Sequence, residues 1–211
     1  MATVESKVGP QTVSDGTTTQ ARLGKAAEAV VQDAHSRFYE SNYRSKRFVA
    51  TSAVAGVAGQ EATSLAASCA LALCNPTNSG VNAVIDKLTI GLISGTAGVC
   101  AYVWAVYAAQ GNTAAAGTAI TPKAANLSSA ASACTAGTGS NVVGGAPTLL
   151  RATGLSTGAN AGGANMPEIL IENVDGGIIL PPGQALVLFG AGAAGTSEKN
   201  IYSLEWEEVP V

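Results

Sequence analysis

Histidine, charged residues and aromatic residues are all scarce in this chain of 211 residues. The single histidine, His35, excludes most active sites that need an imidazole base together with a separate imidazole ligand. Charged residues make up 12% of the chain, against about 25% in typical globular domains. The net charge is only −3, which excludes disorder driven by high net charge. Few side chains therefore remain for chemistry.

Sequence motifs of catalysis and metal binding are also missing. The chain has no P-loop, HExxH or GxSxG motif. Glu205 and Glu207 lie on the same face of a predicted strand. We interpret this as a solvent-exposed strand face rather than as the carboxylate pair of a glycosidase or a calcium site. Without CxxC spacing, the cysteines are expected to be buried free thiols rather than zinc ligands. We therefore predict a protein that is not an enzyme and needs no cofactor or metal. The four cysteines are Cys69, Cys74, Cys100 and Cys134.

What the chain has in excess is small residues and, at its N-terminus, charge. Its 25 glycines and about 40 alanines are close to a third of all residues. Residues 1–47 hold seven of the 11 basic and five of the 14 acidic residues. A basic arm thus precedes a weakly acidic body, which indicates a partner for the arm. The overall pI of about 5.1 argues against nucleic acid, because domains that bind it usually have a pI above about 9.

The first residues contain a charged pair and no apolar run. We therefore expect no signal peptide, and we expect the chain to fold in a reducing cytoplasm.

One amphipathic helix is predicted over residues 20–45. It either packs on its own domain or anchors the chain on another subunit. For the second possibility it offers aromatic residues and arginines, which are enriched at protein interfaces. The apolar stripe consists of Leu23, Ala27, Val30, Val31, Ala34 and Phe38. The candidate capsid-binding or partner-binding residues are Arg37, Phe38, Tyr39, Tyr43, Arg44, Lys46 and Arg47.

From residue 48 onwards, short apolar runs separated by Gly, Pro and Asn predict β-strands. In the C-terminal third, we expect a tight turn at 175–177 and a type II turn at 181–183, with Pro182 and Gly183 at its centre. About eight strands fit a jelly-roll-like double sheet over residues 48–211, after the arm and helix of 1–47. The expected strands cover 48–55, 69–73, a hairpin of 81–93 and 99–107, 148–152, 168–174, 178–180, 185–189 and 202–206.

Two stretches leave a choice of interpretation. Residues 88–109 lack charge over a length that could span a membrane, but their period-two alternation and the break at 94–98 predict strands instead. Residues 110–146 are low in complexity and are either a long loop or short, tightly packed strands. A further loop is expected at 153–166.

Two stretches of the chain resemble small virion proteins of tailed bacteriophages. The first is an NP-x-SG-x-N pattern, here NPTNSGVN, at residues 75–82, which runs into the apolar segment 83–91. The second is the ending, from PPGQAL at 181–186 to LEWEEVPV at 204–211. The run Asp33-Ala34-His35-Ser36-Arg37 before the first strand also fits.

The resemblance implies a capsid decoration, or cement, protein with a β-jelly-roll fold. Such a protein binds the major capsid protein on an icosahedral head, forms a homotrimer and brings no catalytic residue. In this interpretation it is made in the host cytoplasm and ends in the virion, without nucleic acid or membrane as a partner. The alternative is a tail or head-fibre adhesin that recognises a host receptor through the loops 110–146 and 153–166. These loops lack the Tyr, Trp and Arg anchors that dominate binding energy.

Overall fold

The computed structural model describes residues 36–58, 68–95, 99–107, 118–140, 147–157, 169–192 and 198–211. The chain divides into two compact units, residues 1–39 and residues 40–211. The second unit holds all described strands, the first of which begins at Arg47.

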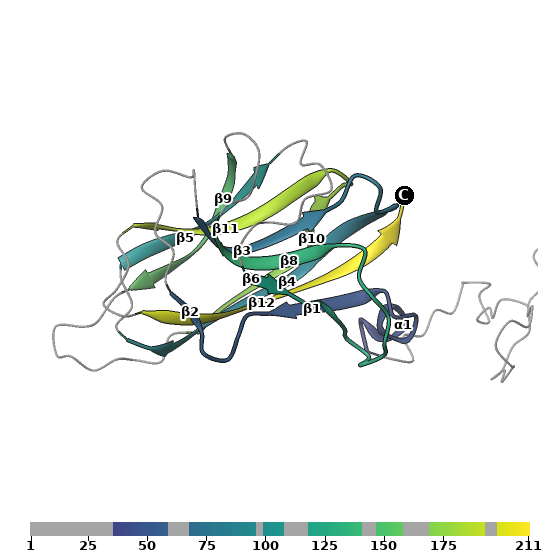
Figure 1. Ribbon diagram of the computed structural model, residues 1–211, viewed down its shortest axis with the longest axis horizontal. Coiled ribbons are helices and arrows are strands. Elements are labelled where there is room, and N and C mark those ends of the chain that lie inside the picture. Colours follow the sequence, from purple (N-terminus) through teal and green to yellow (C-terminus); the bar gives the residue numbers. More distant parts are fainter. Residues whose placement is uncertain are drawn as a thin grey trace, which may run out of the picture. The chain divides into compact units, whose positions relative to one another are not determined.

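Within the described residues, the β unit is built from twelve strands in two six-stranded antiparallel sheets (Figure 1). The first sheet has the order β10-β4-β12-β1-β7, with β2 beside β12, and the second has the order β6-β8-β3-β11-β5-β9. The mainly β prediction is therefore confirmed. The strands are β1 (Arg47–Thr51), β2 (Val57–Ala58), β3 (Ser68–Asn75), β4 (Val81–Ser94), β5 (Val99–Tyr107), β6 (Thr118–Ile120), β7 (Lys123–Ala124), β8 (Thr135–Ser140), β9 (Thr148–Thr157), β10 (Ile169–Leu180), β11 (Gln184–Gly192) and β12 (Lys199–Pro210).

The core lies between the two sheets, and the alternation of apolar residues explains it. In β12, Tyr202, Leu204 and Trp206 are buried, while the residues between them face outwards, as the period-two pattern predicts. They pack with side chains of the second sheet such as Leu71 and Trp104 in one apolar cluster. The central strands β3, β5 and β11 also bury their other face, which explains their nearly continuous small and apolar sequence.

The hairpin expected from 81–93 and 99–107 is wrong. Both segments are strands, β4 and β5, but β4 pairs with β10 and β12, whereas β5 pairs with β11 and β9. The two strands therefore lie in opposite sheets. Each strand buries an apolar face in the shared core. The sequence pattern does not distinguish two paired strands from two strands in facing sheets, because both arrangements bury such a face.

The tight turn expected at 175–177 is also wrong, because β10 continues through it. Asn173 lies opposite Lys87 and Ile178 opposite Ile85, so β10 advances five residues while β4 advances two. The extra residues form a bulge in which Asp175 has a φ of 51° and Gly176 a φ of 79°. The positive φ that the sequence offers for a turn is used here to bulge an edge strand.

The type II turn at 181–183 is confirmed. The amide of Gln184 donates to the carbonyl of Pro181 at 3.3 Å, and Gly183 has a φ of 83°. Asn75 links this turn to the NPTNSGVN stretch, since its side-chain amide donates to the carbonyls of Val81 and Leu180, both at 2.8 Å. The turn at 181–183 and the NPTNSGVN stretch therefore meet in space.

The helix expected over 20–45 is barely present. Residues 20–35 lie outside the described residues, and the described part contains only α1 (Tyr39–Tyr43). The helix ends where Ser45 adopts a φ of 54° and β1 begins at Arg47. In the part of the chain that the structure describes, no helix is long and apolar enough to cross a membrane.

Two low-complexity stretches form strands. Within 110–146, the described residues contain β6, β7 and β8, so short packed strands are correct for this part. The strand expected at 148–152 extends as β9 to Thr157, into the predicted loop, and the remainder of that loop lies outside the described residues.

Candidate functional site

The residues predicted to bind a partner fall into different environments. In the N-terminal unit, the Arg37 guanidinium lies 4.9 Å from the centre of the Phe38 ring. Tyr39 and Tyr43 are the exposed first and last residues of α1. Arg44 forms an exposed ion pair with Glu40, one helical turn away. Lys46 is exposed between α1 and β1. These positions leave most of the predicted residues accessible to a partner.

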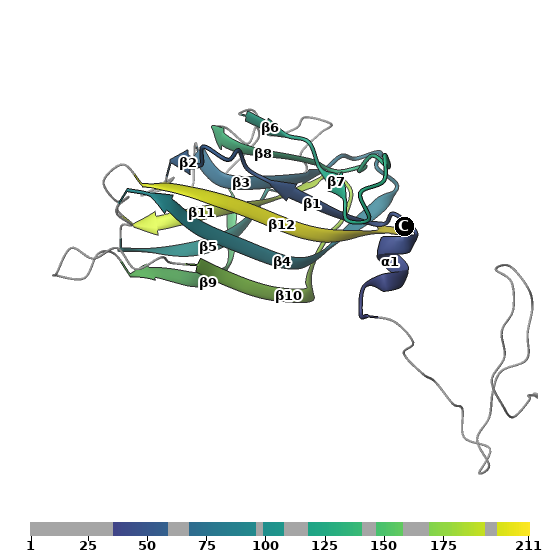
Figure 2. The same ribbon diagram turned by 90° about the horizontal axis from the view of Figure 1, so that it is seen from below.

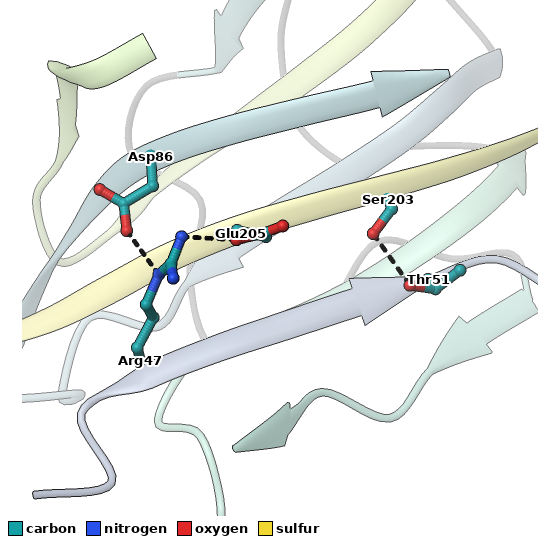
Figure 3. Close-up of polar contacts among 5 residues, drawn as sticks. All are labelled: Arg47, Thr51, Asp86, Ser203 and Glu205. Carbon is teal, nitrogen blue, oxygen red and sulfur yellow. Dashed lines mark hydrogen bonds and ion pairs between the residues drawn. The ribbon is translucent and has the colours of Figure 1, made fainter. Parts of the chain in front are cut away.

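Arg47 is the exception, because it is buried in the β unit. Its Nε donates to Asp86 Oδ2 at 2.9 Å and its Nη2 to Glu205 Oε2 at 2.5 Å, which joins β1, β4 and β12 (Figure 3). Farther along β1 and β12, the Thr51 and Ser203 hydroxyls lie 2.9 Å apart. Arg47 therefore links three strands of the first sheet.

Glu207 is next to this cluster and carries an unfavourable charge. It lies opposite Arg47 in the pairing of β1 with β12. Partial burial, and then the nearby Asp86 carboxylate, raise the pKa of Glu207 above its usual value of 4.5, and the Arg47 guanidinium opposes the shift. The pair of Glu205 and Glu207 therefore consists of one carboxylate bound by Arg47 and one that is easier to protonate than usual.

Next to α1, two non-glycine residues adopt left-handed backbone conformations and are joined by hydrogen bonds. Ser45 has a φ of 54° and Leu127 a φ of 61°. The Asn126 side-chain amide donates to Ser45 Oγ at 2.8 Å, and Ser45 Oγ lies 3.0 Å from Ser128 Oγ. The amide of Leu127 donates to the carbonyl of Ala124 at 2.9 Å. These contacts fix the turn at 124–128 against the end of α1.

This braced turn displays a large apolar side chain. Leu127 is 90% exposed, although a left-handed conformation is costly for a bulky residue. The C-terminal end of β12 lies at the same end of the β unit, because the amide of Glu208 donates to the carbonyl of Lys46 at 2.8 Å (Figures 1 and 2). We call the exposed Tyr43, Leu127, Val209 and Val211 the α1-end surface.

A buried carboxylate anchors the segment that follows this turn. Glu208 accepts hydrogen bonds from the Ser132 hydroxyl at 2.5 Å and from the amides of Ala133 at 3.1 Å and Cys134 at 3.3 Å. The indole Nε1 of Trp206 donates to the same carboxylate at 3.3 Å. Residues 128–136, together with β6 and β7, line a largely apolar hollow of about 410 Å³. An exposed Leu127 beside a hollow gives this end of the β unit a shape that a partner surface can match.

Three cysteines near this region are buried, and two of them have raised pKa values. Cys69, Cys74 and Cys134 are buried and free, as predicted, and the side chain of Cys100 lies outside the described residues. Burial raises the pKa of Cys69 to about 12. Burial and then the Glu208 carboxylate raise the pKa of Cys134 well above its usual range. Protonated thiols are poor nucleophiles at neutral pH.

Among the described side chains, no group of three or more His, Cys, Asp and Glu residues could hold a metal ion. His35, the one imidazole, lies outside the described residues. The α1 end itself presents exposed apolar side chains beside a hollow.

The sequence did not single out Leu127, Val209 or Val211. Leu127 is the one leucine within the low-complexity stretch 110–146, and this is the feature of the sequence that could have pointed to it. No protein-family model matches this chain, and no curated protein or solved structure is significantly similar to it.

Proposed function

We propose that this chain is a non-enzymatic virion structural protein, a decoration or cement protein that binds the major capsid protein on the head of a tailed phage. The resemblance of residues 75–91 and 181–211 to phage virion proteins supports this assignment. The two antiparallel sheets suit the jelly-roll-like double sheet that the resemblance implies. The homotrimer is part of the same proposal.

The observation that carries the proposal is the α1-end surface. An exposed leucine in a costly backbone conformation, braced by Ser45, Asn126 and Ser128, is a local structure that stability alone does not favour. Large exposed apolar side chains that gather at one end of a domain mark interaction sites. The N-terminal segment also joins the β unit through α1, so arm and surface are adjacent along the chain.

A cement protein works by adding buried area between subunits of the shell. A standard interface buries about 1,600 Å² in total, and symmetry repeats each contact many times over the head. A few anchor residues therefore suffice. The exposed Tyr43 and Leu127 are suitable anchors, because burying a large apolar side chain contributes about 1.5–3 kcal/mol.

The experiment uses full-length protein and purified heads that lack it. Leu127→Ala and Tyr43→Ala should each weaken co-sedimentation with the heads about tenfold or more, as expected for an anchor worth about 1.4 kcal/mol. Val54→Ala is the matched control, because Val54 is 88% exposed but lies in the turn between β1 and β2. It should bind like the wild type.

Undiminished binding by the double variant of Leu127 and Tyr43 would remove the α1-end surface from the proposal. If wild-type protein binds no heads and antibodies place it on the tail, the adhesin interpretation replaces the decoration role.

A further inference from the structure

The hollow of about 410 Å³ lies next to Leu127 of the α1-end surface. It is enclosed between residues 119–123, which run from β6 to β7, and residues 128–136, which lead into β8. Its volume is within the range of about 300–1,000 Å³ that is typical of ligand pockets. Because Leu127 directly precedes the second of these segments, a partner that covers Leu127 also reaches the hollow.

The walls of the hollow are mainly apolar. Four alanines line it together with Ile120, Pro122 and Cys134. Ile120 and Ala130 also pack against the core between the sheets, so the inner wall is part of the folded β unit. An apolar group that enters the hollow is removed from water, which favours binding.

Hydrogen bonds keep the second wall in place. The Glu208 carboxylate accepts from the Ser132 hydroxyl and from the amides of Ala133 and Cys134. Glu208 is only 6% exposed, and these donors offset its charge. The wall is therefore formed before a ligand arrives, which lowers the entropic cost of binding.

The charges beside the hollow are positive. Lys123 is the only charged residue of the lining, and it is exposed. Lys46 is also exposed, and it follows Ser45, whose hydroxyl lies 3.0 Å from that of Ser128 in the lining. Neither lysine has an ion-pair partner among the described residues. In a chain with net charge −3, two unpaired lysines beside an apolar hollow favour a ligand that carries a negative charge.

We infer that this hollow binds an apolar group joined to a carboxylate, as neighbouring apolar and acidic side chains of a partner segment present them. Thr121 and Ser129, which are exposed in the lining, supply hydroxyl donors for the carboxylate. In the proposed function the partner is the capsid protein, and to that extent the inference rests on that function.

The first test needs no heads, and its probe is 4-phenylbutyrate, an apolar group that carries a carboxylate. Amide NMR signals of the full-length chain are followed as the probe is added. Signals of residues 119–136 should shift with a Kd of about 2 mM, as expected for a ligand of this size. The uncharged 4-phenylbutan-1-ol should bind at least about threefold more weakly, which is the effect of an exposed ion pair.

Two variants separate the apolar and the charged contribution. Ala131→Trp fills the hollow and should raise the Kd of 4-phenylbutyrate at least about tenfold, whereas Ala53→Trp, at an exposed site between β1 and β2, should leave it unchanged. Lys123→Met should remove most of the preference for the acid over the alcohol, and Lys199→Met, at the other end of β12, should keep it. Ser129→Trp repeats the filling test should Ala131→Trp not fold.

The inference is overturned if about 20 mM 4-phenylbutyrate shifts no signal of residues 119–136, or if the acid and the alcohol bind the wild type equally well. Co-sedimentation with heads is measured separately, and Ala131→Trp should weaken it about tenfold. Heads that bind this variant as well as the wild type would show that the hollow does not receive the partner. A wild-type chain that binds 4-phenylbutyrate in the hollow but binds no heads supports the site and contradicts the decoration role. A chain that binds heads but not the probe contradicts the site alone.

Discussion

Replacing Leu127 by glycine should stabilise the fold even though it removes a large apolar side chain. A left-handed conformation costs an L-residue about 1–2 kcal/mol, and Leu127 holds a φ of 61°. Glycine removes that cost but loses about 0.5–1 kcal/mol through its freer unfolded chain. Since Leu127 is 90% exposed, its lost burial is worth only about 0.2 kcal/mol. The net gain is about 0.5 kcal/mol, or a rise in Tm of about 1–2 °C.

Comparison with alanine makes this test sharper. The alanine variant keeps the left-handed cost, so we expect Leu127→Gly to be more stable than Leu127→Ala by about 0.5–1 kcal/mol in denaturant titrations. At Val54, which is also exposed but has no positive φ, alanine should be the more stable of the two substitutions. Both Leu127 variants should lose binding to heads. A glycine variant less stable than the alanine variant would refute the argument that the turn is strained to display its side chain.

Three further predictions concern stability. Arg47→Met should cost about 3 kcal/mol, because it removes the buried guanidinium that pairs with both Asp86 and Glu205. Arg44→Met at the exposed pair should cost less than about 0.5 kcal/mol, and equal losses in urea titrations would contradict this difference. Glu207→Gln should raise Tm at pH 7. The pKa of Glu207 is raised in the fold, so its ionisation destabilises the fold as the pH rises above 4.5. The gain in Tm should therefore vanish near pH 4, and a gain that persists there would refute ionisation of Glu207 as the cause. Gly154→Ala should lower the free energy of unfolding by about 1 kcal/mol, because the added Cβ displaces Leu170. Gly91→Ala should cost nothing, because a Cβ there meets open space. Calorimetry that finds the two variants equally stable would contradict the close packing of β9 on β10.

Features governed by nearby residues could be predicted from the sequence. The alternation of Tyr202, Leu204 and Trp206 identified β12, because period two reports directly which face is buried. The turn at 181–183 was also predictable, since proline and glycine restrict their own backbone angles.

Pairing between strands could not be predicted in the same way. The sequence around 94–98 shows that the chain turns, but not that β5 enters the opposite sheet from β4. Similarly, Asp175 and Gly176 supply positive φ, which serves a bulge as well as a hairpin turn. The partners that decide between these outcomes are distant in the sequence.

The candidate site shows the same limit. Arg47 looked like the last cation of a basic arm, because its carboxylate partners are 39 and 158 residues away along the chain. Leu127 lay within a low-complexity stretch, and the residues on either side of it are held by hydrogen bonds to Ser45, which is distant in the sequence. The helix expected over 20–45 rested on a periodic stripe of which only Phe38 lies among the described residues, and there the helix is α1 alone.

The most direct test of the proposed function is a cryo-EM reconstruction of heads incubated with the purified full-length chain. The account predicts added density on the outside of the shell that fits the two-sheet unit. In that density the α1-end surface should face the major capsid protein. Bare heads at saturating protein, or bound copies whose α1 end faces away from the shell, would contradict it.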